Sequence, residues 1–142
     1  MDPIGTAAQK SELPVKTIRY YDEIGLIKPQ AHSEKGYRLY SERDIQKLIF
    51  VRHVREFGFS IDTCRDLLDL YENPHRTSKE VKQIVAKKLV EIQAKIRAMK
   101  QLHDTLARLA HDCHGDQRPD CPIIEYFSSD QAVDPSHQKE CS

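Results

Sequence analysis

A chain of 142 residues with 39% hydrophobic residues, no Trp and 31% charged residues has too little apolar material for a large globular core, and it suits long helices in contact with solvent. The formal net charge is zero but uneven, because residues 10–55 and 77–112 each carry +4 whereas residues 113–142 carry −4. Overall neutrality argues against indiscriminate binding to polyanions, while the basic N-terminal region permits phosphate contacts.

The sequence shows no sign of export or membrane insertion. No apolar run approaches the roughly 18–20 residues that a membrane span needs, and the N-terminus lacks the basic-then-apolar layout of a signal peptide. Cys64, Cys113, Cys121 and Cys141 are therefore expected to be thiols rather than disulfides. We expect a cytoplasmic protein without a membrane partner.

The N-terminal residues predict a helix pair followed by a β-turn and a strand. Residues 4–10 and 14–24 predict the two helices, with Pro14 suited to the first helical position and Gly25 to termination. Residues 32–40 predict a turn and a strand. The apolar patch that the helices would bury is formed by Ile4, Ala7, Ala8, Leu13, Ile18, Tyr21 and Leu26. This order is the layout of a winged helix-turn-helix, and we place a DNA-binding domain at residues 1–75.

Two further helices complete this domain. Ser41, with Asp44 three residues later, predicts the N-cap of an amphipathic helix that ends near Gly58. The next helix begins after the cap Ser60 and is stopped by Asn73-Pro74.

Residues 77–112 predict a single helix of about 54 Å, capped by Thr77 or Ser78 and free of Gly and Pro. Its apolar positions alternate at spacings of four and three, the pattern of a coiled-coil seam. The seam comprises Val85, Leu89, Ile92, Ile96, Met99, His103, Leu106 and Ala110. So narrow a stripe on so long a helix predicts a dimer. His103 could be a metal ligand, but a seam residue that sets the register is the favoured interpretation.

A cysteine loop follows the long helix. Cys113 and Cys121 bracket it, residues 122–127 predict a short helix opened by Pro122, and the polar residues 128–142 predict a flexible tail. Thiolates are soft ligands for Cu(I), Zn(II) and similar ions. We therefore place a metal-binding segment at residues 113–127.

Basic and hydroxyl side chains gather on the predicted head. These are Lys16, Thr17, Arg19 and Tyr20 on the second helix, and Lys35, Tyr37 and Arg38 on the turn and strand. Such side chains contact phosphates and base edges. The alternative is a solvated basic face, but the order of the elements favours DNA binding.

The sequence resembles the mercury-resistance-type (MerR) transcription regulators over about residues 4–127. The resemblance is carried by Thr17-Ile18-Arg19-Tyr20-Tyr21-Asp22-Glu23-Ile24-Gly25-Leu26-Ile27, by Gly36-Tyr37-Arg38-Leu39-Tyr40, and by the stretch from Arg52 to Ile61. It implies a mainly α homodimer with antiparallel long helices, which holds two winged heads on a palindromic promoter and distorts the DNA so that RNA polymerase can engage.

Carried onto this chain, the resemblance places Lys16 and Arg19 at the major groove, and Tyr21, Tyr37 and Arg38 on the DNA backbone. Tyr21 could equally be a core residue. His32 departs from the family, in which this wing position often carries Arg, and a phosphate contact there would be weaker or pH-dependent.

Within the family, the cysteine loop most resembles that of the copper-efflux (CueR-like) regulators. This implies one Cu(I) per subunit, held linearly by Cys113 and Cys121, with Ag(I) or Au(I) as possible substitutes. Ser78 stands where the divalent-ion and mercury sensors carry Cys, and Lys82 of the partner subunit would offset negative charge. Zinc prefers four ligands, so two thiolates satisfy it poorly.

Several alternatives stay open at this point. His111, His114, Asp116 and Asp120 could complete a Zn(II) site, and the cysteine pair could be a redox disulfide. A coiled-coil metal-buffering protein that does not bind DNA is a further alternative. No nucleophile–base pair, phosphate loop or open catalytic metal site indicates an enzyme. Cys64 is expected to be a buried apolar residue, and Cys141 has no assigned role.

Overall fold

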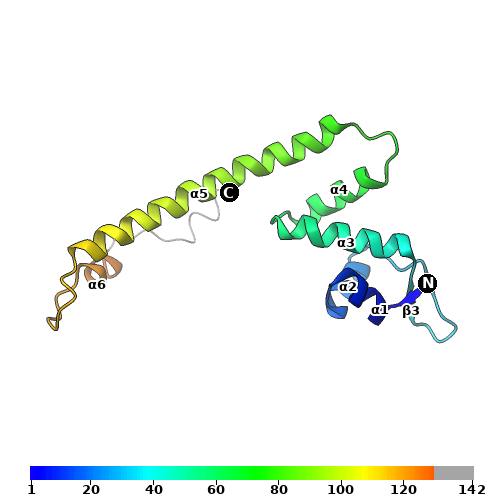
Figure 1. Ribbon diagram of the computed structural model, residues 1–142, viewed down its shortest axis with the longest axis horizontal. Helices are drawn as coiled ribbons and strands as arrows, with labels where there is room; N and C mark the ends of the chain where they lie inside the picture. The colour runs from blue at the N-terminus through cyan, green and yellow to red at the C-terminus, as the bar shows by residue number, and fades with distance from the viewer. Residues whose placement is uncertain (130–142) are drawn as a thin grey trace. The chain divides into compact units, whose positions relative to one another are not determined.

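The computed structural model describes residues 1–129, which form two compact units, Met1–Ile84 and the chain from Val85 onward. The elements in chain order are β1 (Asp2–Pro3), α1 (Ile4–Ser11), α2 (Val15–Glu23), β2 (Ala31–His32), β3 (Arg38–Tyr40), α3 (Glu42–Glu56), α4 (Ile61–Glu72), α5 (Ser78–Asp112) and α6 (Pro122–Phe127). This mainly helical order with a winged head and one long helix (Figure 1) confirms the predicted fold class. Within residues 1–129, none of the helices combines the length and the apolar character that a membrane span requires.

The helix pair α1–α2 is joined by a tight turn. Glu12 ends α1 in the left-handed conformation (φ 58°), which costs an L-residue roughly 1–2 kcal/mol. The buried Ser11 hydroxyl donates to the carbonyl of Ala7 at 2.7 Å, which satisfies this polar group inside the core. Pro14 caps α2 in an extended conformation rather than forming its first helical residue, so the predicted helix start was one residue early. Gly25, at φ +73°, terminates α2 as expected.

The wing is part of a three-stranded antiparallel sheet of order β1-β3-β2. Its hairpin turn is closed by Ser33, whose backbone N–H donates to the carbonyl of Tyr37 at 2.8 Å, while its hydroxyl accepts the Tyr37 N–H at 3.1 Å. Strand β1 pairs Asp2 with Tyr40 and was not predicted, because two residues are too few to show an alternating pattern.

Helices α3 and α4 support the α1–α2 pair from one side, with α3 between the pair and α4 (Figure 1). The predicted capping box is present: the Asp44 N–H donates to Ser41 Oγ at 3.1 Å, and the Ser41 N–H donates to the Asp44 carboxylate at 3.0 Å. Ser60 caps α4. Arg65 of α4 donates to the carbonyls of Ile24 and Gly25, both at 3.1 Å, and so ties α4 to the end of α2.

The core of this first unit contains four residues of the predicted apolar patch, Ala7, Ile18, Tyr21 and Leu26, while Ile4, Ala8 and Leu13 pack against it. Its other buried members are Ile27, Tyr40, Ile45, Leu48, Val51, Cys64 and Leu68. The core therefore holds α2, the wing and the α3–α4 pair together.

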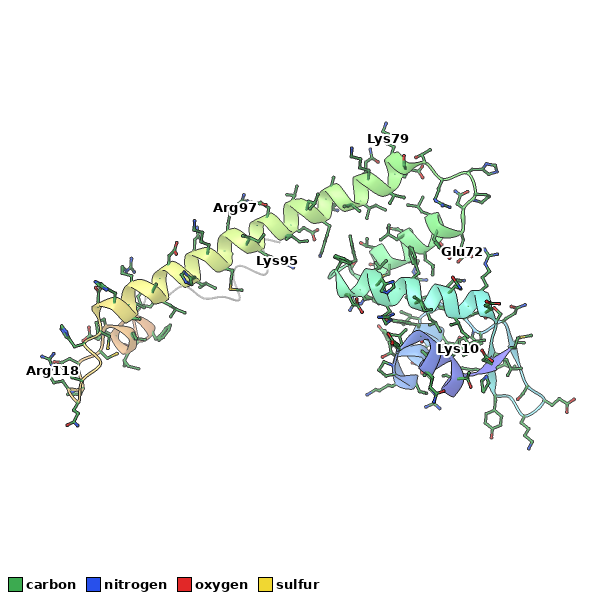
Figure 2. The ribbon with its side chains drawn as sticks, in the orientation of Figure 1. Lys10, Glu72, Lys79, Lys95, Arg97 and Arg118 are labelled. Carbon is green, nitrogen blue, oxygen red and sulfur yellow. The ribbon has the colours of Figure 1, made fainter. Side chains whose placement is uncertain are left out.

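The long helix α5 begins where the sequence predicted. The Thr77 hydroxyl accepts the backbone N–H of Glu80 at 3.3 Å and caps the helix. Charged side chains such as Lys79, Lys95 and Arg97 lie along it (Figure 2). Most large side chains of the predicted seam are exposed in the single chain: Val85 at 42%, Leu89 at 60%, Ile96 at 56%, Met99 at 67% and Leu106 at 49%, while Ile92 is half-buried.

Candidate metal site and nucleic-acid interface

The two loop cysteines meet in space. Cys113 follows directly after α5, Cys121 caps α6, and their sulfur atoms lie 3.7 Å apart. A disulfide would require about 2.05 Å, so both are free thiols. If each sulfur bound an ion at about 2.3 Å, the zinc–sulfur length, a linear arrangement would span about 4.6 Å. The pair therefore needs to open by less than about 1 Å to hold a two-coordinate ion.

The surroundings of Cys121 stabilise its thiolate. The hydrogen bond from the backbone N–H of Ile124 lowers the pKa of this thiol most. Hydrogen bonds from the Ile123 N–H and from the Cys113 thiol lower the pKa further. Partial burial and the nearby Glu125 carboxylate oppose the shift. Because a thiolate is the form that binds metal, the start of α6 prepares Cys121 as a ligand.

The other candidate ligands do not converge on the sulfurs. Within residues 1–129, no group of three or more His, Cys, Asp and Glu side chains comes together to hold a metal. Asp116 instead pairs with Arg118, with Oδ2 and Nε 2.7 Å apart, and His111 and His114 are exposed. The described residues of one chain thus present two sulfur donors and no third ligand.

The remaining residues linked to this site stay predictions. Ser78 is the first residue of α5, and Lys82 is exposed one turn later. Both belong to the first unit. Cys64 is fully buried in the core, where desolvation raises the pKa of its thiol, as expected for a packing residue. Cys141 lies outside the described residues.

The exposed face of α2 carries most of the proposed DNA-contacting side chains. Lys16 and Arg19 are exposed, Thr17 is half-buried, and Tyr20 is 48% exposed. The first turn of α2 contains no acidic residue that would offset the positive end of the helix dipole. This combination favours a negatively charged partner.

The wing adds a second basic surface. Lys35 is exposed at the hairpin turn, and Tyr37 projects from it with 68% of its surface exposed. The guanidinium of Arg38 on β3 is fixed by a hydrogen bond, because its Nε donates to Oδ2 of Asp22 on α2 at 2.7 Å. Recognition helix and wing are thereby linked through a charged pair.

Tyr21 is a correction to the predicted set of DNA contacts. Only 5% of this residue is exposed, and it packs in the core beside Ile18. Burial raises the pKa of its phenol, with the Arg55 guanidinium partly offsetting that shift. The core interpretation therefore holds for Tyr21, while its neighbour Tyr20 presents a ring to solvent. The physical reason is that neighbouring side chains point about 100° apart on a helix.

Sequence reasoning missed Asp22 as a member of this interface. A signal for it exists, since Asp22 lies three residues after Arg19 and such residues share one face of a helix. Its partner Arg38 is distant in sequence, however, and only the folded structure shows the pair.

A helix-turn-helix reader, a sheet-borne wing and basic side chains on both define the first unit as a DNA-binding head of the winged helix-turn-helix class. Residues 3–70 match the family model described as "MerR HTH family regulatory protein", and residues 45–109 match "MerR, DNA binding".

The chain is 50% identical over 125 residues to the HTH-type transcriptional regulator HmrR of Rhizobium leguminosarum bv. viciae, covering 88% of this chain and 96% of HmrR. It is 38% identical over 125 residues to the HTH-type transcriptional regulator CueR of Salmonella typhimurium, covering 88% and 91%. The structure of PbrR691 from Ralstonia metallidurans CH34, in complex with lead(II), matches with a TM-score of 0.78 and 30% identity over 90% of this chain and 100% of that one. The chain belongs to the MerR family of transcription regulators.

Proposed function

We propose that the protein is a Cu(I)-responsive transcriptional activator that works as a homodimer on a palindromic promoter and induces copper-efflux genes. The observation that carries the metal assignment is the meeting of Cys113 and Cys121 without a third ligand among the described residues. Two thiolates suffice for a monovalent soft ion such as Cu(I), Ag(I) or Au(I), whereas Zn(II) prefers four ligands. The resemblance of the loop to the copper-efflux branch supports the same ion, one per subunit.

The charge of the bound state also fits this chain. A monovalent ion between two thiolates leaves a net charge of −1, which is costly to bury without compensation. The backbone N–H groups of Ile123 and Ile124 already face Cys121 and would stabilise that charge. Lys82 of the partner subunit would contribute from outside the loop, with Ser78 beside it in place of a third thiolate.

The exposed apolar seam of α5 supports the homodimer. A seam that one chain cannot cover is satisfied by a second copy. Charge favours the antiparallel arrangement: residues 76–88 carry five Lys/Arg against one Glu, while residues 112–125 carry four Asp/Glu against one Arg. Antiparallel pairing brings the basic start of one helix close to the acidic loop at the end of the other.

The winged head supports promoter binding. Lys16, Thr17, Arg19, Lys35, Tyr37 and Arg38 form the proposed interface, with Tyr20 added and Tyr21 assigned to the core. Metal binding would order residues 113–121, dock α6, reset the angle between the two heads and so distort the promoter for RNA polymerase.

The decisive experiment compares loop variants in a promoter–reporter assay. Cys113→Ser and Cys121→Ser should abolish induction by copper while purified protein still retards a promoter fragment. His114→Ala is the matched control, because it removes an exposed neighbouring histidine that only the zinc alternative would use and should leave induction intact. A copper response that survives both cysteine changes would exclude the proposed site.

The alternatives give different results. Metal titration of the reduced protein under a strong Cu(I) competitor, with sulfur counting by X-ray absorption, should find two sulfurs per copper. More than two sulfurs, or tight Zn(II) binding lost in His114→Ala, would favour the zinc regulator. Induction by peroxide without metal would favour the redox regulator, which the 3.7 Å sulfur contact also suits. Failure of the purified protein to retard the promoter with or without metal would favour a metal-buffering protein.

A further inference from the structure

The role of Asp22 is not explained by promoter binding, because a carboxylate on the DNA-facing side of the head repels phosphate. Asp22 belongs to the recognition helix α2 and Arg38 to strand β3 of the wing. Their Oδ2 and Nε atoms lie 2.7 Å apart, and the side chains are only 19% and 31% exposed. The pair therefore spans the two elements that would touch DNA.

The way Arg38 is held leaves most of its hydrogen-bonding groups available. A guanidinium carries five N–H groups in a planar fork. Asp22 accepts from Nε, and among the described residues no further hydrogen bond from the Arg38 guanidinium is found. The two terminal amino groups can thus bind a second anion while Nε stays on Asp22. A lysine carries three donors on a single nitrogen atom, so it cannot serve two anions from separate nitrogen atoms of a planar fork.

The other carboxylates offer Arg38 no equivalent anchor. Glu23 lies near enough to favour the charged guanidinium, but among the described residues it accepts no hydrogen bond from it. The Asp44 carboxylate already accepts the backbone N–H groups of Ser41 and Gln30, at 3.0 and 3.1 Å. Tyr40 is fully buried, and its hydroxyl has no hydrogen-bond partner in the described part of the chain. Without Asp22, the Arg38 side chain would be free to take many rotamers, and DNA binding would have to order it.

We propose that Asp22 is a positioning residue, which clamps Arg38 through Nε so that its terminal amino groups face a DNA phosphate and the wing stays in register with α2. This inference rests on the proposed DNA interface. The clamp predicts an effect of removing Asp22 on DNA affinity that is opposite to the effect that charge repulsion alone predicts. Removing a carboxylate beside a polyanion should strengthen binding, whereas removing a clamp should weaken it.

The wild-type protein is first used to select a DNA duplex from a random-sequence library. The affinity of each variant for this duplex is then measured by fluorescence anisotropy at fixed salt. Asp22→Ala removes both the charge and the acceptor for Nε and should bind about tenfold more weakly, the size of one charge-assisted hydrogen bond. Glu23→Ala is the matched control, because it removes an exposed carboxylate that acts on Arg38 through its charge without accepting a hydrogen bond from it, and it should bind as well as wild type or more tightly. Thermal unfolding of each variant checks that the head remains folded.

Two further variants separate positioning from a general charge effect. Arg38→Lys keeps the positive charge and leaves Asp22 in place, so it tests the clamp even if Asp22→Ala unfolds. It should bind more weakly than wild type, because lysine has no planar fork that serves Asp22 and a phosphate from separate nitrogen atoms. In the Arg38→Ala background, Asp22→Ala should cause no further loss, because the residue that Asp22 positions is gone.

Each outcome decides a different statement. If Arg38→Ala binds like wild type, or if wild type selects no duplex, the proposed interface fails and the clamp with it. If Arg38→Ala binds weakly but Asp22→Ala binds as tightly as wild type or more so, the interface stands and the clamp is refuted. Full rescue by Arg38→Lys would also refute it.

Discussion

The apolar seam of α5 gives the most quantitative prediction, through a pair of neighbouring residues. Leu89 and Val90 are both exposed in the single chain, at 60% and 69%. Only Leu89 lies on the seam, because each residue of a helix turns the next side chain by about 100°. We expect Leu89→Ala to weaken dimerisation and Val90→Ala to leave it unchanged.

The size of the effect follows from the exposed fraction. Full burial of a leucine side chain stabilises by about 1.5–3 kcal/mol. Since 60% of Leu89 remains to be covered, its burial in a dimer contributes about 1–2 kcal/mol per copy. A two-fold symmetric dimer contains two copies, so Leu89→Ala should cost about 2–4 kcal/mol and raise the dimer Kd roughly 30- to 1,000-fold.

Sedimentation equilibrium over a range of protein concentrations measures this Kd directly. The wild-type protein and Val90→Ala should show the same dimer stability, with Leu89→Ala shifted towards monomer. Equal shifts for the two variants would show that the seam is not the interface. An unchanged Kd for Leu89→Ala would refute the reasoning from burial.

The remaining predictions concern the stability of the head, measured by urea unfolding. Gly25→Ala should lower the free energy of unfolding by about 1–2 kcal/mol, because Gly25 has φ +73°. Gly5→Ala in α1 should raise it by up to about 1 kcal/mol, because an added Cβ meets no atom within 4 Å there. Ser41→Ala removes the cap of α3 and should cost about 0.5–2 kcal/mol; no loss would mean that the capping box is dispensable. Burial raises the pKa of the Cys64 thiol and of the Tyr40 phenol in the folded state. The stability that each protonated group contributes is therefore fully present below its ordinary pKa, about 8.5 for Cys and about 10 for Tyr. It is lost as the pH rises through the higher pKa of the folded state. The free energy of unfolding should therefore decline from about pH 8.5 upward, by up to about 1.4 kcal/mol per pH unit for each group. Cys64→Ala should remove the first part of that decline. If the variant shows the same decline as the wild-type protein, the role given to Cys64 is contradicted.

Features that depend on neighbours along the chain were determined by the sequence alone. The caps Ser41 and Ser60, the terminator Gly25 and the long helix with its seam all follow from residues within one or two turns of each other. Such signals are short-range, because capping, left-handed conformation and helical periodicity each involve only a few adjacent residues. The sequence also predicted that Cys113 and Cys121 form one candidate site, since the two residues bracket one short loop.

Features that join distant segments were decided only by the tertiary structure. Strand β1 is too short to show a pattern and exists because β3 pairs with it. The sequence left Tyr21 open between core and DNA, and packing in the core of the first unit buried it while leaving Tyr20 exposed. The contact of Asp22 with Arg38 crosses 16 positions of the chain and depends on how the wing sits against α2. The sequence thus determined which residues could meet DNA and metal, whereas packing decided which side chains face outward and what holds them there.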